Sequence, residues 1–90
     1  ITTSHAAWVT LYTDTTSRTV DAIRSETTDP TPGSGVLAEV ITTSGVTQLI
    51  SPGTICYNSA GSNTTYAKVV NKSGTQVNLQ ITLTLVPLEV

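Results

Sequence analysis

Residues 77–85, near the end of the sequence, alternate strictly between aliphatic and polar side chains. The aliphatic positions are Val77, Leu79, Ile81, Leu83 and Leu85. Successive side chains point to opposite faces of a strand, so this pattern predicts one long β-strand with an apolar face and a polar face. Such a strand is not stable alone. It requires hydrogen-bonded neighbours and a second layer over its apolar face.

The composition also favours β structure. The chain has 90 residues, is visibly rich in Thr, Ser and Val, and lacks Phe and Met, and β-branched side chains fit a pleated surface. This length predicts a single domain, residues 1–90, with a thin core. The net charge is −2 with only four Lys and Arg residues, which argues against nucleic acid as a partner. A sparsely charged surface is typical of domains that work outside the cell and pack against copies of themselves.

Residues 7–13 are predicted to form the first strand. Val9 and Leu11 would lie on one face and Trp8 and Tyr12 on the other. Apolar groups on both faces indicate either burial on both sides or one side that contacts a partner subunit.

Residues 14–28 are the least strand-like part of the sequence. The spacing of Val20 and Ile23 allows one helical turn. The segment also holds closely spaced charges, which continue to the following aspartate: Arg18, Asp21, Arg24 and Asp29. These charges would either grip a ligand or a neighbouring subunit, or form a local ion-pair network that pins this connection to the sheet.

A second strand is predicted over residues 36–43, after the Pro- and Gly-rich turn 29–35. Val36, Ala38 and Val40 would point inward. Leu37 and Ile41 would then form a second apolar patch on the outer face, beside Glu39.

The rest of the chain gives further short strands separated by turns. We expect turns at 44–45 and 51–53, a strand at 54–57, an exposed loop at 58–63, a strand at 66–71 and a tight hairpin at 72–74 that leads into the final strand. About six or seven short strands predict an all-β fold, a two-layer antiparallel sandwich of the immunoglobulin-like or jelly-roll-like kind. A small β-barrel is the alternative. Residues 1–5 and 87–90 are candidate inter-subunit strands or linkers, since Pro87 interrupts the final strand.

The sequence lacks the parts of a catalytic or metal site. The one His, His5, and the one Cys, Cys56, are far apart in sequence, and Cys56 is expected to be a small buried apolar residue. The run Gly33-Ser34-Gly35 is too short to cradle a phosphate. We therefore predict no enzyme, no cofactor and no metal. There is also no apolar run long enough to span a membrane and no signal-peptide pattern.

Two Asn residues, Asn63 and Asn71, fit the N-glycosylation pattern beside predicted turns. The pattern is short and arises often by chance, and Asn is common in turns for geometric reasons. The Thr-rich surface would accept O-linked sugar equally well.

Three stretches carry a resemblance to a known family: 4–14, 17–36 and 69–74. Together they resemble a small β-domain found as a repeated or terminal unit in uncharacterised virion structural proteins of phages that infect cyanobacteria and other aquatic bacteria. The likeness extends from Ser4 to Glu89. It implies a non-enzymatic building block of an extracellular assembly, and it transfers no functional residue.

Two functions are therefore expected. The first is a structural subunit that polymerises into an extracellular fibre or virion surface through sheet edges and exposed apolar faces. Its candidate interface residues are Trp8, Tyr12, Leu37, Ile41, Leu88 and Val90. The alternative is a carbohydrate-binding or adhesion module that binds glycans through Trp8, Tyr12, Tyr57 or Tyr66.

Overall fold

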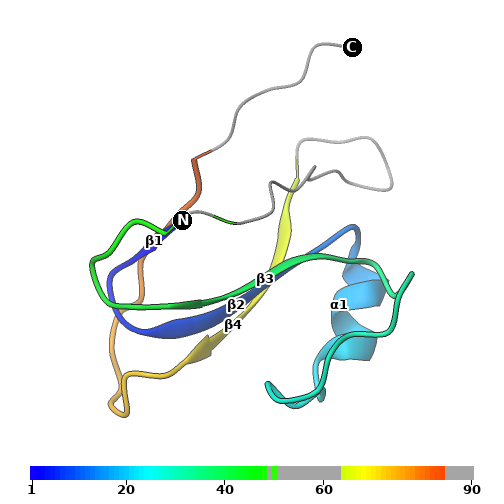
Figure 1. The fold of residues 1–90 in the computed structure, drawn as a ribbon, viewed down its shortest axis with the longest axis horizontal. Helices are drawn as coiled ribbons and strands as arrows, with labels where there is room; N and C mark the ends of the chain where they lie inside the picture. Colours follow the sequence, from blue (N-terminus) through cyan, green and yellow to red (C-terminus); the bar gives the residue numbers. More distant parts are fainter. Residues whose placement is uncertain (49, 51–63, 85–90) are drawn as a thin grey trace.

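The computed structural model of this chain describes residues 1–48, 50 and 64–84. Within these ranges the fold is mostly β, with five strands in two small antiparallel sheets and one short helix (Figure 1). In chain order the elements are β1 (Thr2–Thr3), β2 (Ala7–Tyr12), α1 (Thr15–Asp21), β3 (Val36–Thr42), β4 (Tyr66–Asn71) and β5 (Ile81–Thr82). Neither sheet closes on itself in the described part of the chain, so the barrel alternative is wrong.

The larger sheet has three strands in the order β3-β2-β4, with β2 in the centre. β2 pairs with both neighbours in antiparallel fashion, so that Val9 lies opposite Val40 on one side and Val69 on the other. Every residue of β2 is buried. The predicted strands over 7–13, 36–43 and 66–71 are thereby confirmed, as is burial on both faces of the first.

A β-bulge changes which side chains of β3 reach the core. The register shifts between Leu11 and Tyr12, which lie opposite Ala38 and Val36, so Leu37 is the extra residue. Leu37 packs against the core cluster together with Ala38. The prediction that Leu37 lies on the outer face is therefore wrong, because strict alternation does not hold across a bulge.

The final segment keeps the predicted alternation but forms only a short ladder. Over residues 77–84 the odd positions are half-buried and the even positions are exposed, and Leu79, Ile81 and Leu83 pack on the core. Regular strand structure is confined to Ile81–Thr82, which pairs with β1. The prediction of one long strand is wrong over the rest of the described segment, since its partner strand β1 is only two residues long.

The predicted tight hairpin at 72–74 is also wrong. β4 and β5 belong to different sheets, so the chain passes from one sheet to the other in this region. The Asn71 side chain organises the turn, because it accepts a hydrogen bond from the Ser73 amide (2.8 Å) and donates one to the Thr75 carbonyl (2.7 Å). Gly74 adopts a positive φ of 81°.

Helix α1 is longer than the single turn predicted, and a local cap explains it. Asp14 has an extended backbone and accepts a hydrogen bond from the amide of Ser17 at 2.7 Å, the usual N-cap arrangement. Val20 and Ile23 do not anchor the helix, since they are 74% and 96% exposed. The side of α1 that contacts the sheet is polar.

Gly35 brings the start of β3 close to the helix. It has a positive φ of 87°, and a Cβ at this position would overlap the side chain of Ser17. Its carbonyl accepts a hydrogen bond from the amide of Thr13 at 2.9 Å. Only Gly accepts both the positive φ and the close approach to Ser17 without strain.

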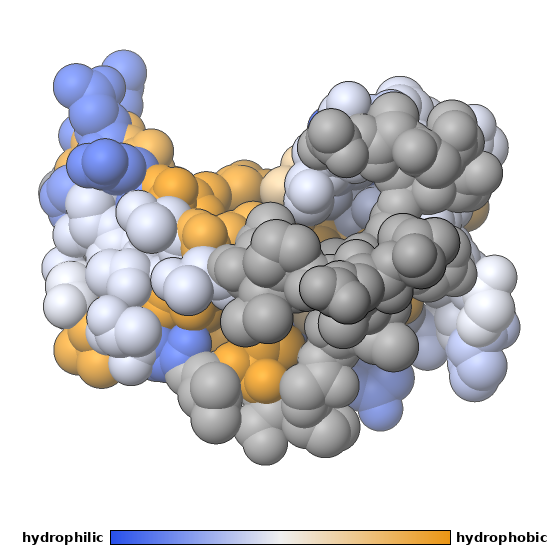
Figure 2. Space-filling model, turned by 90° about the horizontal axis from the view of Figure 1, so that it is seen from above, coloured by the Kyte–Doolittle hydropathy of each residue, from blue (hydrophilic) through white to orange (hydrophobic). Residues whose placement is uncertain are grey.

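The two faces of the three-stranded sheet have different covers. Val9 and Leu11 belong to an apolar cluster with Ile1 and Ala7, packed against half-buried residues that include those near β5. Trp8, Thr10 and Tyr12 lie on the opposite face, where Asp21 at the end of α1 binds the Tyr12 hydroxyl and Arg24 lies over the Trp8 ring. The apolar layer is thin, and Figure 2 shows apolar residues, in orange, visible in a hollow between more polar flanks.

The first residues of the chain are part of this core. Ile1 is buried, and Thr3, which is fully buried, donates a hydrogen bond from its hydroxyl to that of Thr42 at 2.6 Å. β1 already pairs with β5 and bridges to Thr47. Residues 1–5 are thus engaged within the chain, which argues against their expected role as an inter-subunit strand. Residues 87–90, the other candidate, lie outside the described residues.

Candidate functional site

The polar cover of β2 centres on Asp21, the last residue of α1. The hydroxyl of Tyr12 donates a hydrogen bond to Asp21 Oδ2 at 2.6 Å. Arg24 binds the same carboxylate through two nitrogens, Nε to Oδ1 at 2.7 Å and Nη2 to Oδ2 at 3.1 Å. This bidentate geometry is the strongest form of an Arg–carboxylate pair.

Arg24 extends the cluster to the edge strand β3. Its guanidinium also pairs with the carboxylate of Glu39 and donates to the carbonyl of Thr28 at 2.7 Å. Thr10 donates from its hydroxyl to Glu39 Oε2 at 3.1 Å. One arginine therefore joins the end of the helix, the following loop and β3.

Lys68 brings the opposite edge strand, β4, into the same cluster. Its Nζ donates to the Asp21 carbonyl at 3.2 Å and lies 3.5 Å from the Asp21 carboxylate. It also lies 4.2 Å from the centroid of the Trp8 ring, with the Arg24 guanidinium 5.5 Å away from that ring. Trp8 thus sits beneath two cations, an arrangement in which each cation is attracted to the ring face.

The pKa values of the cluster follow from these contacts. The hydrogen bonds from Arg24 lower the pKa of Asp21 from 3.8 to about 2, against the opposing effect of burial. Burial raises the pKa of Glu39, but the hydrogen bond and positive charge of Arg24 outweigh this, together with the nearby indole N–H of Trp8 and the hydroxyl of Thr10, so its pKa lies below the usual value. Burial and the bond to Asp21 raise the pKa of the Tyr12 phenol. Both acids are therefore charged and the phenol is neutral near pH 7.

We refer to these six residues as the ionic clamp: Trp8, Tyr12, Asp21, Arg24, Glu39 and Lys68. Its two carboxylates are matched by two cations, and each charged group has a partner within the chain. The Trp8 indole nitrogen is the one buried side-chain polar atom without a hydrogen-bond partner among the described residues. In residues 1–48, 50 and 64–84, no three His, Cys, Asp or Glu side chains lie close enough to hold a metal ion. The arrangement holds the helix and its following loop on the sheet.

The structure brings only two of the four residues of the predicted charged segment together. Asp21 and Arg24 form the centre of the clamp. Arg18 instead lies over the ring of Tyr66, 5.5 Å from its centroid. Asp29 is exposed and makes no ion pair with any residue that the structure describes.

Sequence reasoning missed Glu39 and Lys68 as clamp residues. Both lie directly opposite Thr10, one on each neighbouring strand. The sequence shows a charged residue in the middle of each of these two strands. It does not show the strand register, which places Glu39 and Lys68 beside Arg24 and Asp21.

The expected assembly interface has less exposed surface than the sequence indicated. Trp8 and Tyr12 are 5% and 1% exposed, because the clamp covers them, and Leu37 packs on the core. Ile41 is half exposed. It lies on the clamp face of the sheet, opposite Trp8, and Val70 lies on the other side of Trp8. Leu88 and Val90 lie outside the described residues.

Of the two candidate glycosylation residues, the structure describes Asn71, which is exposed. Its amide is engaged in the turn at Ser73 and Thr75. Asn63 lies outside the described residues, as do Cys56, Tyr57, the predicted strand 54–57 and the loop 58–63.

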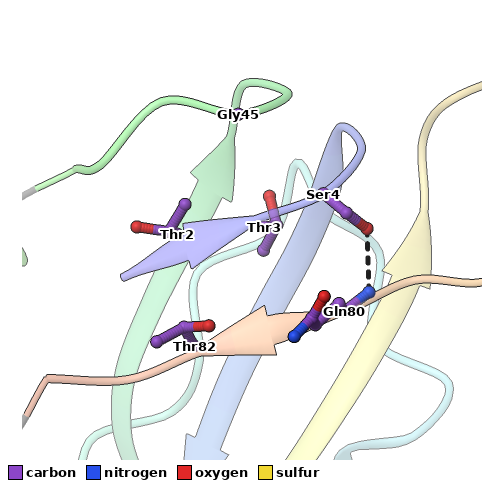
Figure 3. A pocket seen from close by; sticks show the side chains of 6 residues that line it. All are labelled: Thr2, Thr3, Ser4, Gly45, Gln80 and Thr82. Atoms are coloured by element: carbon purple, nitrogen blue, oxygen red, sulfur yellow. Dashed lines mark hydrogen bonds between the residues drawn. The ribbon is translucent and has the colours of Figure 1, made fainter.

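A shallow depression of about 180 Å³ lies between β1, β5 and the turn after β3 (Figure 3). Its lining residues are Thr2, Thr3, Ser4, Gly45, Gln80 and Thr82. The hydroxyls from β1 and the residue after it already have partners: Thr2 with Thr47, Thr3 with Thr42, and Ser4 with the amide of Gln80. The Thr3–Thr42 bond joins the two sheets. The residues that line the depression include no aromatic ring for a ligand.

The two edges of the three-stranded sheet differ. At β3, the Gln48 side chain donates to the Ile41 carbonyl (3.1 Å) and accepts from the Thr43 amide (2.7 Å). These are backbone groups that a neighbouring strand would otherwise use. At β4, no described residue hydrogen-bonds to the outward side of the strand. Among the described residues, β4 is therefore the more open edge.

Comparison with family models, curated proteins and solved structures finds no match to this chain. Among the described residues, no helix combines the length and the apolar character needed to cross a membrane.

Proposed function

We propose that this chain is a non-enzymatic structural module that assembles with copies of itself through a sheet edge, as part of an extracellular fibre or virion surface. The observation that carries the proposal is the outward edge of β4, which has no strand partner in the described part of the chain. An uncovered edge presents a row of backbone donors and acceptors that another chain can pair with.

The surroundings of this edge support association. Val69 and Val70, in the middle of β4, are 39% and 38% exposed. The only charged residue of β4 is Lys68, which protects an edge when it points to solvent, but here the clamp holds it over Trp8. A thin apolar core also gains stability when such residues are buried against a neighbour.

The finer architecture is part of the proposal. The two small sheets are two layers of an antiparallel sandwich of the immunoglobulin-like or jelly-roll-like kind, with about six or seven strands. The resemblance to phage virion domains points to the same class of protein and is the basis for placing the assembly outside the cell.

The carbohydrate-binding alternative has less support. A glycan site of this kind needs exposed aromatic rings, but Trp8 and Tyr12 are buried and the ring of Tyr66 is in contact with Arg18. Tyr57 lies outside the described residues.

The test of self-association compares two matched lysine substitutions. Val69→Lys adds a charge to the open edge, and Val46→Lys adds the same charge at a residue of similar exposure, 49%, in the turn after β3. Sedimentation across a concentration series and electron microscopy should show wild-type oligomers or polymers that Val69→Lys weakens and Val46→Lys does not. A wild-type chain that stays monomeric at its highest soluble concentration would contradict the proposal.

A further inference from the structure

The alternation of hydrogen bonds along β4 identifies which backbone groups have no partner among the described residues. The amide of Lys72 donates to the carbonyl of Ala6 at 2.9 Å, and the register continues in antiparallel fashion to Tyr66 opposite Tyr12. Inward and outward residues alternate in such a ladder. The backbone N–H and C=O groups of Ala67, Val69 and Asn71 therefore point away from β2.

The same reasoning on the other side of the sheet shows that β3 is partly closed. The outward groups there include the Ile41 carbonyl and the Thr43 amide, both of which bind the amide side chain of Gln48. A strand added at β3 would have to displace Gln48. A strand added at β4 displaces no contact between described residues, so the sheet is most readily extended at β4.

We propose that β4 pairs with β4 of a second copy, in antiparallel orientation about a two-fold axis at Val69. This inference rests on the proposed self-assembly and specifies its contact. The two three-stranded sheets would become one continuous six-stranded sheet in the order β3-β2-β4-β4-β2-β3, held by up to about six new ladder hydrogen bonds. Growth beyond this dimer requires another surface.

Charge selects this register over its neighbours. With the axis at Val69, Lys68 lies opposite Val70 of the second copy, and the two Val69 side chains face each other. A shift by two residues in one direction puts Lys68 opposite Lys68, and a shift in the other direction puts it opposite Lys72. Like charges directly opposite each other destabilise a strand pair. Of these three registers, the one centred on Val69 avoids this, and it also buries a half-exposed aliphatic side chain.

The test is disulfide trapping in a Cys56→Ser background, which removes the single native thiol. In the proposed register Val69→Cys places two thiols on directly opposed residues with a Cα separation of about 5.5 Å, within the range a disulfide spans. Ala67→Cys places them roughly 14 Å apart, too far to bond. Mild oxidation should thus link Val69→Cys chains on the order of tenfold more than Ala67→Cys chains.

A mixed experiment checks the register independently of Val69. Ala67 lies opposite Asn71 of the second copy, so Ala67→Cys mixed with Asn71→Cys should form the heterodimeric disulfide, whereas each variant alone should not. Self-linking of Ala67→Cys as efficient as that of Val69→Cys would overturn the register. Circular dichroism of each reduced variant confirms that it is folded.

Sedimentation of the Cys56→Ser chain separates failure of this inference from failure of the proposed function. A chain that associates but forms neither the Val69→Cys link nor the mixed link between Ala67→Cys and Asn71→Cys would refute pairing at β4 and leave self-assembly standing. A chain that remains monomeric and gives no link refutes both.

Discussion

The two faces of β2 are buried by opposite means. On one face Val9 and Leu11 are covered by aliphatic side chains that include Ile1 and the residues in and beside β5. On the other, Trp8, Thr10 and Tyr12 are covered by a helix end and the charged side chains that follow it. The first cover needs only apolar contact, whereas the second requires each charge to meet a partner in the right geometry.

This difference shows how a small chain buries a central strand without a large apolar core. Val20 in α1 and Ile23 after it are left in solvent, and the helix uses Asp21 as its contact with the sheet. Arg24 then spans from the helix end to Glu39 on β3. The clamp replaces a second apolar layer, and its stability should therefore depend on pH and on single charged residues, unlike that of the apolar face.

The largest effect is expected on the apolar face. Leu11 is 2% exposed in the core cluster, so Leu11→Ala should lower the free energy of unfolding by about 3 kcal/mol through lost burial and a cavity. Urea denaturation followed by Trp8 fluorescence measures it. Val20→Ala, on an exposed helix position, is the control and should change stability by less than about 0.5 kcal/mol. Equal effects would mean that the Val9–Leu11 face is not the main core.

On the clamp face, Asp21→Asn should cost about 2 to 3 kcal/mol, because it leaves Arg24 and Lys68 with one carboxylate between them. Asp29→Asn makes the same chemical change at an exposed residue without an ion pair among the described residues, and it should have an effect within about 0.5 kcal/mol. Thermal or urea unfolding of both variants gives the comparison. A loss for Asp21→Asn no larger than for Asp29→Asn would show that the clamp contributes little to stability.

The two faces also differ in how far the sequence predicts them. Alternation identified the inward residues of β2 and of 77–84 correctly, because a period of two needs no knowledge of neighbours. It placed Leu37 on the wrong face, since a bulge depends on the pairing partner. Likewise, the length of β1 sets the length of the ladder that β5 forms, and the alternating pattern in 77–85 carries no information about β1.

The clamp was predictable only in its local part. Asp21 and Arg24 are three residues apart and their pairing needs no tertiary information. Glu39 and Lys68 join them only because both strands pair with β2 in registers that place them opposite Thr10. The pattern around Trp8 and Tyr12 left open whether this face is buried within the chain or contacts a partner subunit, and nothing in it showed that a polar helix end would cover them.

Acid should weaken the clamp face specifically. The folded-state pKa of Asp21, about 2, lies below its ordinary value of 3.8, so this group adds stability above pH 4 that is lost as the pH falls from about 4 to 2. The expected loss is about 1 to 2 kcal/mol. Urea midpoints measured between pH 6 and pH 2 should fall in the wild type, and they should fall less in Asp21→Asn, which has no carboxyl at this position. Parallel curves for the two proteins would contradict the assignment.

The smallest effect is expected for Tyr12→Phe, which keeps the ring and removes only the hydrogen bond to Asp21. Because Arg24 and Lys68 still bind this carboxylate, the loss at pH 7 should be about 1 kcal/mol. The pKa of the Tyr12 phenol is raised, so its contribution to stability depends on pH in the opposite direction to that of Asp21. This contribution is complete below pH 10 and declines above that value, because the phenol of the unfolded chain then ionises. Ultraviolet titration of the folded wild type should therefore show one tyrosine that stays protonated above pH 10, and Tyr12→Phe should lack it. If Tyr12→Phe still showed the late-titrating tyrosine, that tyrosine would not be Tyr12. The Tyr12 phenol would then be accessible to solvent, and the tight cover of this face of β2 by the clamp would be disproved. The apolar face of β2 would be unaffected by that result.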